Sequence, residues 1–265
     1  MIHNIKVSVL ISNFNKENYL EQCINSCLFQ EYHNIEIIVF DNISTDNSFN
    51  IIKKFENRIK IKVKNRISHI ASENQTDILV EAFKISSGDL ICLLDSDDYF
   101  YSKKINTIVE QFSQNKKVKI LFDIPRINKK DKIEPFKIKK KINTYIWPSV
   151  IPTSGITLRR DFFDQCLNVD LFSNYPRVEI DFKLNFFSQK ITKNFKIIDD
   201  QLTFYRDDVV GGVMANNKKF FKYWWLRRLQ AHFFIQSIYQ KNNIKFNENY
   251  DFYITKLINI FLKND

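Results

Sequence analysis

The fold of this chain is decided by residues 88–98, which read Gly-Asp-Leu-Ile-Cys-Leu-Leu-Asp-Ser-Asp-Asp. The apolar run over 90–94 is short and begins just after a glycine, so it predicts a buried strand. The carboxylates of Asp95, Asp97 and Asp98 follow where that strand ends. Because like charges repel and burial adds to their cost, this acidic cluster is expected to be solvated or to hold a cation, and hard oxygen ligands suit Mg²⁺ or Mn²⁺. Aspartates also favour turns and helix N-caps, which is the alternative interpretation.

Strand and helix patterns alternate on the N-terminal side of this stretch. Such alternation implies β-α-β units and a mostly parallel sheet. The carboxyl ends of parallel strands lie along one edge, where ligand sites of open α/β sheets form. The acidic cluster is therefore expected to share one crevice with the loop over 12–15 and with Asp41. The predicted elements are strands over 7–11, 35–40 and 59–63, and helices over 17–29, around 51–55 and over 74–86.

The side chains expected around this crevice suit a nucleoside diphosphate. Phe14 could stack on a base, and Ser12 or Asp41 could hydrogen-bond its edge. Asp95 could bind ribose hydroxyls, while Asp97 could hold a metal ion that bridges the two phosphates. The sequence contains no G-x-G-x-x-G fingerprint and no Walker loop, which argues against dinucleotide oxidoreductases and P-loop enzymes.

Three blocks of the sequence, in this order and at this spacing, resemble the family 2 glycosyltransferases of GT-A fold. The blocks are residues 7–30, 35–48 and 88–98. The resemblance is strong over 5–112 and weaker beyond. It implies an inverting transferase that uses a nucleotide sugar and a divalent metal, in a family that builds capsules, lipooligosaccharides and other bacterial glycans.

The resemblance also implies roles for single residues. The residues it assigns to the donor are Ser12, Phe14, Asn15, Asp41 and Asp95. Ser12, Phe14 and Asp41 match positions that hold the base, commonly uracil, and Asp95 matches the ribose-side carboxylate of the D-x-D motif. Asp97 matches the metal-binding carboxylate of that motif, and Asp98 lies beside it as a second metal-site residue.

The sequence departs from the family pattern at three places. Residues 12–15 read Ser-Asn-Phe-Asn instead of Pro-Thr-Tyr-Asn, so the stacking ring is kept without its hydroxyl. Ile43 stands where the family has glycine, and because isoleucine adopts a positive φ only at a cost, the loop is expected to differ locally. The family's usual Ala-Arg-Asn is not evident around Gln75, so the arginine that would contact phosphate there is missing.

Inverting transfer needs a carboxylate that accepts the proton of the attacking hydroxyl. Residues 178–184 read Val-Glu-Ile-Asp-Phe-Lys-Leu and resemble the acidic pair that opens a helix in this family. Asp181 is the expected base and Glu179 the second candidate, because residues at i and i+2 do not share a helix face. The alternative is that both carboxylates only complement the helix dipole. Arg206 matches a family arginine and is expected to neutralise the diphosphate.

The net charge of +10 favours an acidic partner, such as a diphosphate substrate or an anionic lipid surface. The basic aromatic segment 218–240 suits peripheral contact with a membrane, with a homodimer face or a cover for the core as alternatives. The basic segment 116–141 is predicted to be an exposed hairpin. No apolar run approaches the ~20 residues of a membrane span. No signal peptide is evident, and the four cysteines lack metal-type pairing, so we expect reduced core cysteines and a cytoplasmic setting.

These patterns together predict an α/β protein of GT-A fold, with a mostly parallel central sheet flanked by helices and a helical C-terminal appendage. The expected divisions are a GT-A domain over 1–213, split into a nucleotide-binding half over 1–115 and an acceptor-side half over 116–213, and a basic aromatic helical region over 214–265.

The expected function is metal-dependent inverting transfer from a UDP-sugar to a hydroxyl of a glycan or lipid-linked saccharide. The expected cofactor is Mn²⁺ or Mg²⁺, the expected setting is the inner face of a bacterial cytoplasmic membrane, and nucleic acid is not expected as a partner. One alternative is a non-catalytic basic module that binds nucleic acid or lipid. The other is a sugar nucleotidyltransferase, which would need a basic, glycine-rich loop in place of residues 12–15.

Overall fold

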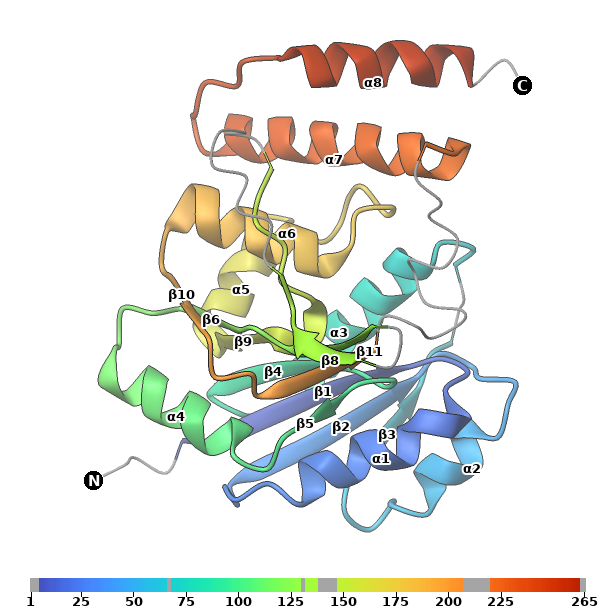
Figure 1. The fold of residues 1–265 in the computed structure, drawn as a ribbon, viewed down its shortest axis with the longest axis vertical. Coiled ribbons are helices and arrows are strands. Elements are labelled where there is room, and N and C mark those ends of the chain that lie inside the picture. Colours follow the sequence, from blue (N-terminus) through green and yellow to red (C-terminus); the bar gives the residue numbers. More distant parts are fainter. Residues whose placement is uncertain (1–4, 66–67, 130–131, 138–146, 207–219, 263–265) are drawn as a thin grey trace.

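A computed structural model describes residues 5–65, 68–129, 132–137, 147–206 and 220–262 (Figure 1). Its strands form a central seven-stranded sheet and a smaller four-stranded sheet. The central sheet has the order β10 (Phe195–Ile198), β6 (Ile120–Asp123), β9 (Ile156–Arg159), β4 (Leu90–Asp95), β1 (Val7–Asn13), β2 (Ile35–Asp41) and β3 (Lys60–Val63). The smaller sheet has the order β5 (Tyr99–Phe100), β11 (Thr203–Arg206), β7 (Arg126–Lys129) and β8 (Lys132–Pro135).

The central sheet is mostly parallel, as the alternation of strand and helix patterns predicts. Only β9 runs antiparallel to its neighbours β4 and β6 among the paired strands of this sheet that the structure describes. The register places Asn13 opposite Asp41 and Ser12 opposite Asp95. The ends of β1, β2 and β4 therefore meet at one edge of the sheet, and the predicted crevice residues lie there.

Helices cover both faces of the central sheet (Figure 1). One face packs against α1 (Glu17–Leu28), α2 (Ser48–Lys53) and α4 (Lys104–Gln114). The other face packs against α3 (Ala71–Ile85), α5 (Arg160–Asn168), α6 (Ile180–Phe186) and α7 (Lys222–Lys241). Two short helical turns complete this side, the 3₁₀ turn η1 (Thr153–Gly155) and the π turn η2 (Phe187–Thr192).

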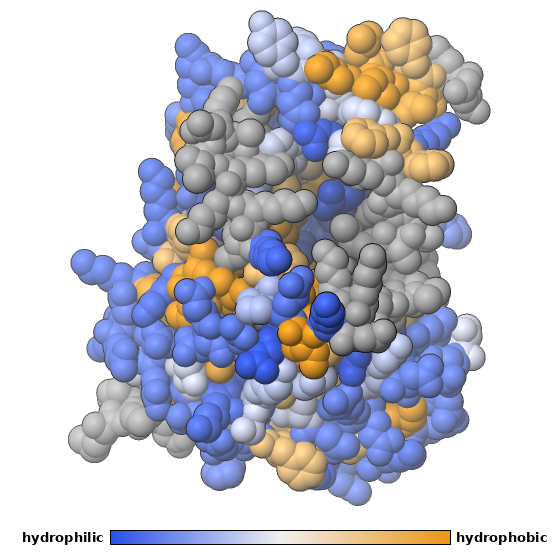
Figure 2. Space-filling view, in the orientation of Figure 1, coloured by the Kyte–Doolittle hydropathy of each residue, from blue (hydrophilic) through white to orange (hydrophobic). Residues whose placement is uncertain are grey.

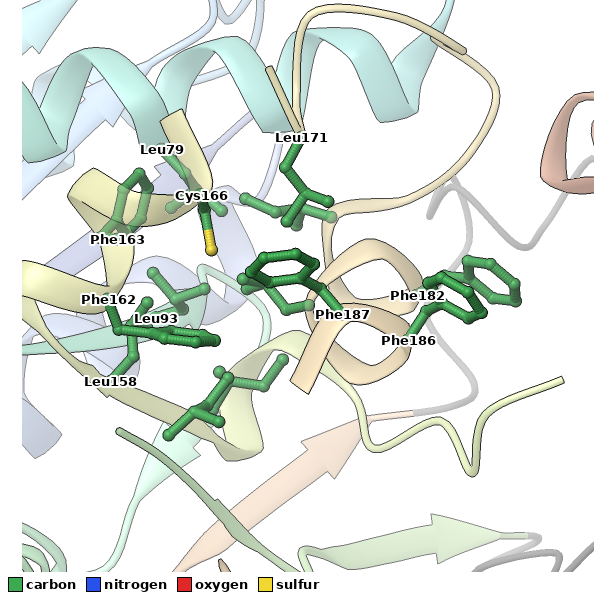
Figure 3. Packing of buried hydrophobic residues seen from close by; sticks show 14 of the residues in the cluster. Leu79, Leu93, Leu158, Phe162, Phe163, Cys166, Leu171, Phe182, Phe186 and Phe187 are labelled. Atoms are coloured by element: carbon green, nitrogen blue, oxygen red, sulfur yellow. The ribbon is translucent and has the colours of Figure 1, made fainter. Parts of the chain in front are cut away.

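Phenylalanine fills the core between α3, α5 and α6. Figure 3 shows Phe162 of α5 near Phe187, which continues from α6, while Phe163 points to another side of α5. The Phe163 ring stacks on Phe83 of α3 with 4.1 Å between the ring centroids, and Phe162 lies 6.0 Å from Phe187. Large rings that bury this much area fix the position of α6 against the sheet, and α6 is the helix that carries the acidic pair.

The C-terminal helices form the outermost layers (Figure 1). The inner helix α7 buries Ala231, Phe234, Ile235 and Ile238 in the same core as α5 and α6. The outer helix α8 (Tyr250–Phe261) packs on α7. No helix among the described residues has the length and apolar character needed to span a bilayer. The expected boundary between 213 and 214 lies outside the described residues.

Two sequence expectations are wrong and one alternative is confirmed. The basic segment 116–141 is not wholly an exposed hairpin, because β6 is a fully buried strand of the central sheet; only β7 and β8 pair as a hairpin. Ile43 does adopt a positive φ, of 57°, so the loop keeps the left-handed residue that we expected it to lose. For the segment 218–240, the alternative that it covers the core is confirmed for α7. The four cysteines are buried and form no disulfide, as predicted.

Candidate active site at the carboxyl edge of the sheet

Two loops that follow β1 and β2 are held together by side-chain hydrogen bonds. Asp41 is buried beneath them, and its carboxylate accepts from the Asn13 amide at 2.7 Å and from the Ser44 backbone N–H at 2.9 Å. Asn15, at φ 50°, accepts from the Thr45 backbone N–H at 2.8 Å. Asp41 therefore links the two loops from a buried position. Its predicted contact with a base, and the predicted contact of Asn15 with the donor, stay predictions.

Two apolar side chains of these loops are exposed to solvent. Phe14 is 44% exposed and Ile43 is 38% exposed, so a flat ring could approach Phe14 from solvent. The left-handed conformation at Ile43 costs free energy in a β-branched residue. The hydrogen bonds that Asp41 makes to Ser44 help to hold the loop in that conformation.

Asp95 ends β4 and lies at the middle of the edge. Its Oδ1 accepts hydrogen bonds from the Ser12 hydroxyl at 3.1 Å and from the Gln75 amide at 2.6 Å. Burial, together with the charge of Asp97, raises the pKa of Asp95 to about 6. Gln75 therefore occupies this place as a neutral donor to a carboxylate, consistent with the missing arginine noted in the sequence.

Asp98 is fully buried behind the cluster. Its two carboxylate oxygens accept from the Ser154 hydroxyl at 2.5 Å and from the Arg206 backbone N–H at 2.8 Å. Burial and the neighbouring Asp97 and Asp95 raise its pKa well above the usual range. Since both oxygens are already used, Asp98 links η1 and β11 to the acidic cluster in this structure, and its predicted role at a metal stays a prediction.

Asp97 is the member of the cluster whose carboxylate forms an ion pair. Its Oδ2 lies 3.0 Å from Nζ of Lys16, and its side chain is 16% exposed. Its backbone carbonyl accepts from the Arg206 guanidinium. No group of three His, Cys, Asp or Glu side chains among the described residues could hold a metal ion by itself. A divalent ion at Asp97 would thus take most of its oxygen ligands from substrate phosphate and water, which is the usual arrangement for Mg²⁺ at phosphate sites.

Arg206 lies against the cluster from the end of β11. Besides its bond to Asp97, its guanidinium donates to Oε1 of Gln22 at 2.6 Å. The guanidinium also lies over the rings of Tyr19 and Tyr99, 4.8 and 5.4 Å from their centroids. Ring stacking and hydrogen bonds fix this cation at the edge where the diphosphate is expected.

The two carboxylates at the start of α6 have different partners. Glu179 is buried and pairs with Arg227 of α7, whose Nε lies 2.5 and 2.7 Å from the two carboxylate oxygens. Asp181 forms no ion pair with a described residue. Burial, and next the charge of Glu179, raise the pKa of Asp181 to about 7, although Arg227 opposes the shift. A carboxyl group with such a pKa can exchange protons near neutral pH.

The structure brings the predicted residues from the two halves of the chain together. Arg206, from the second half, binds Asp97 and Asp98 of the first half in the candidate site, and the charge of Asp95 makes a minor contribution to the raised pKa of Asp181. Sequence reasoning missed Lys16 and Arg227 as members of this site. Lys16 lies within residues 7–30, one of the segments that resemble the family, directly after Asn15. Arg227 had no local signal, because it meets Glu179 only through the packing of α7 on α6.

Comparison with known proteins identifies a family over the region that carries this site. The model of the family described as "Glycosyl transferase family 2" matches residues 8–167. The chain is 29% identical over 180 residues to an uncharacterised glycosyltransferase of Nostoc sp., covering 63% of this chain and 54% of that protein. It is 36% identical over 112 residues to WfaP of Escherichia coli, covering 42% of this chain and 43% of that protein. WfaP is named a UDP-Glc:alpha-D-GlcNAc-diphosphoundecaprenol beta-1,3-glucosyltransferase. The chain thus spans about half the length of these relatives.

Solved structures share the fold. TarS 1–349 of S. aureus in complex with UDP-GlcNAc superposes with a TM-score of 0.62 at 17% identity, covering 85% of this chain and 66% of that one. The mannosyltransferase PcManGT of Pyrobaculum calidifontis, in complex with GDP-Man and Mn²⁺, also gives 0.62, at 12% identity over 94% of this chain and 67% of that one. Because the family model covers more than half of the chain, including β1, β2 and the acidic cluster, the chain belongs to glycosyl transferase family 2 and has the GT-A fold.

Proposed function

We propose that this chain transfers a sugar from a UDP-sugar to a hydroxyl group of a saccharide, with inversion at the anomeric carbon. The observation that carries the proposal is the acidic cluster at the carboxyl edge of the sheet, where Arg206 binds Asp97 and Asp98. This edge suits a nucleotide sugar, and Asp181 at the start of α6 supplies a carboxylate that can accept a proton. Family membership favours this function over a non-catalytic binding module and over a nucleotidyltransferase.

The proposed reaction is one displacement. The acceptor oxygen forms a bond to the anomeric carbon as the bond from that carbon to the diphosphate oxygen breaks, and the hydroxyl proton passes to Asp181. Arg206 would stabilise the negative charge that develops on the leaving diphosphate. Asp97 would hold a divalent ion together with substrate phosphate, and such an ion, when bound, stabilises the same charge. Glu179 would stay paired with Arg227, and its charge would help to keep the pKa of Asp181 raised.

A pocket of about 170 Å³, lined in part by Phe182, the residue after Asp181, suits the acceptor. It lies between α6 and α7 and is lined by Trp147, Phe182, Trp224, Arg227 and Arg228, among others. Aromatic faces suit the C–H surfaces of a sugar ring, and the N–H groups that Arg227 and Arg228 do not use on Glu179 and Asp251 suit its hydroxyls. A saccharide carried on a diphosphate-linked lipid, as in the name of WfaP, would match this lining.

We also propose that the C-terminal helices bring the enzyme to an anionic membrane. Figure 2 shows apolar side chains gathered over α8 and the start of α7. The exposed residues of this apolar band are Phe220, Phe221, Tyr250, Tyr253, Ile254, Leu257, Ile260 and Phe261. Those on α8 follow a helical spacing on its outer side, and the net charge of the chain is +10. An apolar stripe on a basic protein suits a lipid interface, which would supply a lipid-linked acceptor.

The proposed function is tested by a panel of UDP- and GDP-sugars with released nucleotide as the signal. One donor is expected to be turned over slowly with water as acceptor, and faster with its saccharide acceptor. Asp181→Asn is expected to lower acceptor-dependent turnover by roughly 10²–10⁴-fold, because it removes the general base. Asp164→Asn, on the exposed side of α5, is the matched control and should leave the rate unchanged. Full activity in Asp181→Asn would contradict the assigned base.

A further inference from the structure

One cation sits on the acidic cluster where a divalent ion would bind. The Nζ atom of Lys16 lies 3.0 Å from Oδ2 of Asp97, and the lysine side chain is 10% exposed. Apart from this ion pair, the buried ammonium makes no hydrogen bond to the described part of the chain. An ammonium has three N–H donors, so two of them are unused in this position. Lys16 is therefore held by one charge contact and would gain from further acceptors.

The backbone of Lys16 is fixed, while its side chain can move. Its N–H donates to the Ser48 hydroxyl at 3.1 Å, and its carbonyl accepts from Tyr19 and Leu20 at 2.9 and 3.0 Å where α1 begins. The four-carbon stem has rotamers that swing the ammonium over several ångströms. To leave Asp97, the lysine would need only a new side-chain rotamer, while the backbone bonds that hold the loop stay in place.

Lys16 and a divalent ion exclude one another at Asp97. A Mg²⁺ ion binds a carboxylate oxygen at about 2.0–2.1 Å, so an ammonium that stayed on the same oxygen would bring two positive charges into close contact. A diphosphate adds negative oxygens beside the cluster and gives the displaced ammonium new acceptors. Among the described residues, Arg206 is a second cation at the edge; it is already bound to Asp97 and Gln22, and Gln75 carries no charge.

We propose that Lys16 is a displaceable counter-cation, which neutralises Asp97 in the empty enzyme and moves to the donor diphosphate when a divalent ion takes Asp97. This inference rests on the proposed function. It makes metal and donor binding mutually dependent, because each removes an obstacle to the other. Metal should bind weakly to the free enzyme and tightly together with the nucleotide.

The test measures Mn²⁺ binding by electron paramagnetic resonance, with and without UDP. Lys16→Met removes the competing charge, so the variant should bind Mn²⁺ alone about tenfold more tightly than the wild type, which corresponds to about 1.4 kcal/mol. The same variant should bind UDP with Mn²⁺ more weakly, since the diphosphate loses its lysine. Lys16→Arg keeps the charge and should restore the wild-type pattern. Lys116→Met, at an exposed position, is the matched control and should behave like the wild type.

The opposite shift in the two affinities separates this role from a structural one. A variant that is merely less well folded would lose both affinities together, and thermal unfolding of each variant shows whether that has happened. Unchanged or weaker binding of Mn²⁺ alone by folded Lys16→Met would overturn the inference. If UDP binding by the wild type still depended on Asp97 in that case, the proposed function would stand. Failure of the wild type to bind any nucleotide with Mn²⁺ would overturn both.

Discussion

Asp181 and Glu179 lie two residues apart and have opposite surroundings. Glu179 is neutralised by Arg227, while Asp181 is half-buried without an ion-pair partner among the described residues. Burial favours the protonated form of a carboxyl group, and the charge of Glu179 adds to that effect. Glu179 is therefore a structural carboxylate, and Asp181 is the candidate base.

The raised pKa of Asp181 predicts the pH dependence of transfer. The base must be ionised, so acceptor-dependent turnover should rise with pH and level off above about 7. A raised folded-state pKa also means that the folded protein binds the proton more tightly than the unfolded chain. The stability from this group is thus full below the unfolded value of about 4 and is lost as pH rises through about 7. Thermal unfolding of Asp181→Asn should lack this loss, and identical pH profiles for the two proteins would contradict it.

At the residue scale, the sequence placed several candidate residues at the correct edge of the sheet but did not find their partners. Ser12, Asp41 and Asp95 could be placed at one edge because strand period and strand order determine which residues follow each strand. The ion pair of Lys16 with Asp97 depends on a side-chain rotamer, which no local pattern encodes. The left-handed Ile43 was missed because propensity disfavours it, and the hydrogen bonds of Asp41 overcome that preference.

At the element scale, a buried lysine joins the two sheets beneath the site. Nζ of Lys104, on α4, donates to Asp123 of β6 at 2.5 Å, to Thr203 of β11 at 2.6 Å and to the carbonyl of Ser154 in η1 at 2.9 Å. The side chains of Lys104 and Asp123 are fully buried. This network holds Ser154 where its hydroxyl reaches Asp98.

Removing one partner of this network should be costly. Lys104→Met would leave the Asp123 carboxylate buried without its cation, so the free energy of unfolding should fall by about 3–5 kcal/mol. Urea unfolding measures the change, and Lys103→Met, at the exposed neighbouring position, should alter it by less than about 0.5 kcal/mol. A double variant with Asp123→Asn should recover part of the loss. An equal, small effect of the Lys104 and Lys103 variants would show that the network contributes little.

The sequence predicted the elements before residue 100 well and those after it less well. The early strands and helices carry clear apolar periods, and each was placed within a few residues of its observed bounds. The strand β6 was hidden in a basic segment, because its four residues have lysines on their N-terminal side and it is buried only by long-range pairing with β9 and β10. The neighbouring lysines favoured an exposed segment over a buried strand, whereas pairing with β9 and β10 buries these residues in the structure.

At the scale of the whole molecule, the outer layer carries the proposed membrane contact. The exposed apolar band on α8 lies on the far side of α7 from the central sheet (Figure 1, Figure 2). The N-terminal end of α7 and the C-terminal end of α8 lie together, where the Asn259 amide donates to the carbonyl of Trp225 at 3.0 Å. The two helices therefore present their exposed aromatic and aliphatic residues as one surface.

This surface predicts sedimentation with anionic vesicles. The wild type should bind vesicles that contain phosphatidylglycerol more strongly than neutral ones, and less strongly at high salt, because the chain is basic. Leu257→Asp with Ile260→Asp should lower the bound fraction severalfold, since it places charges in the apolar stripe. Val63→Asp, which charges an exposed apolar residue of β3, is the matched control. A concentration-dependent dimer that the α8 variant abolishes, without vesicle binding by the wild type, would instead assign the surface to a second copy of the chain.

The most direct test of metal-dependent sugar transfer follows release of UDP from the preferred UDP-sugar, with and without Mn²⁺, in the wild type and in Asp97→Asn. Release should need Mn²⁺ in the wild type and should be lost in Asp97→Asn, because that substitution removes the charged oxygen expected to hold the ion beside the diphosphate. Asp164→Asn should release UDP at the wild-type rate. Release that is equal with and without Mn²⁺, and equal in Asp97→Asn, would contradict a metal-dependent site at the acidic cluster.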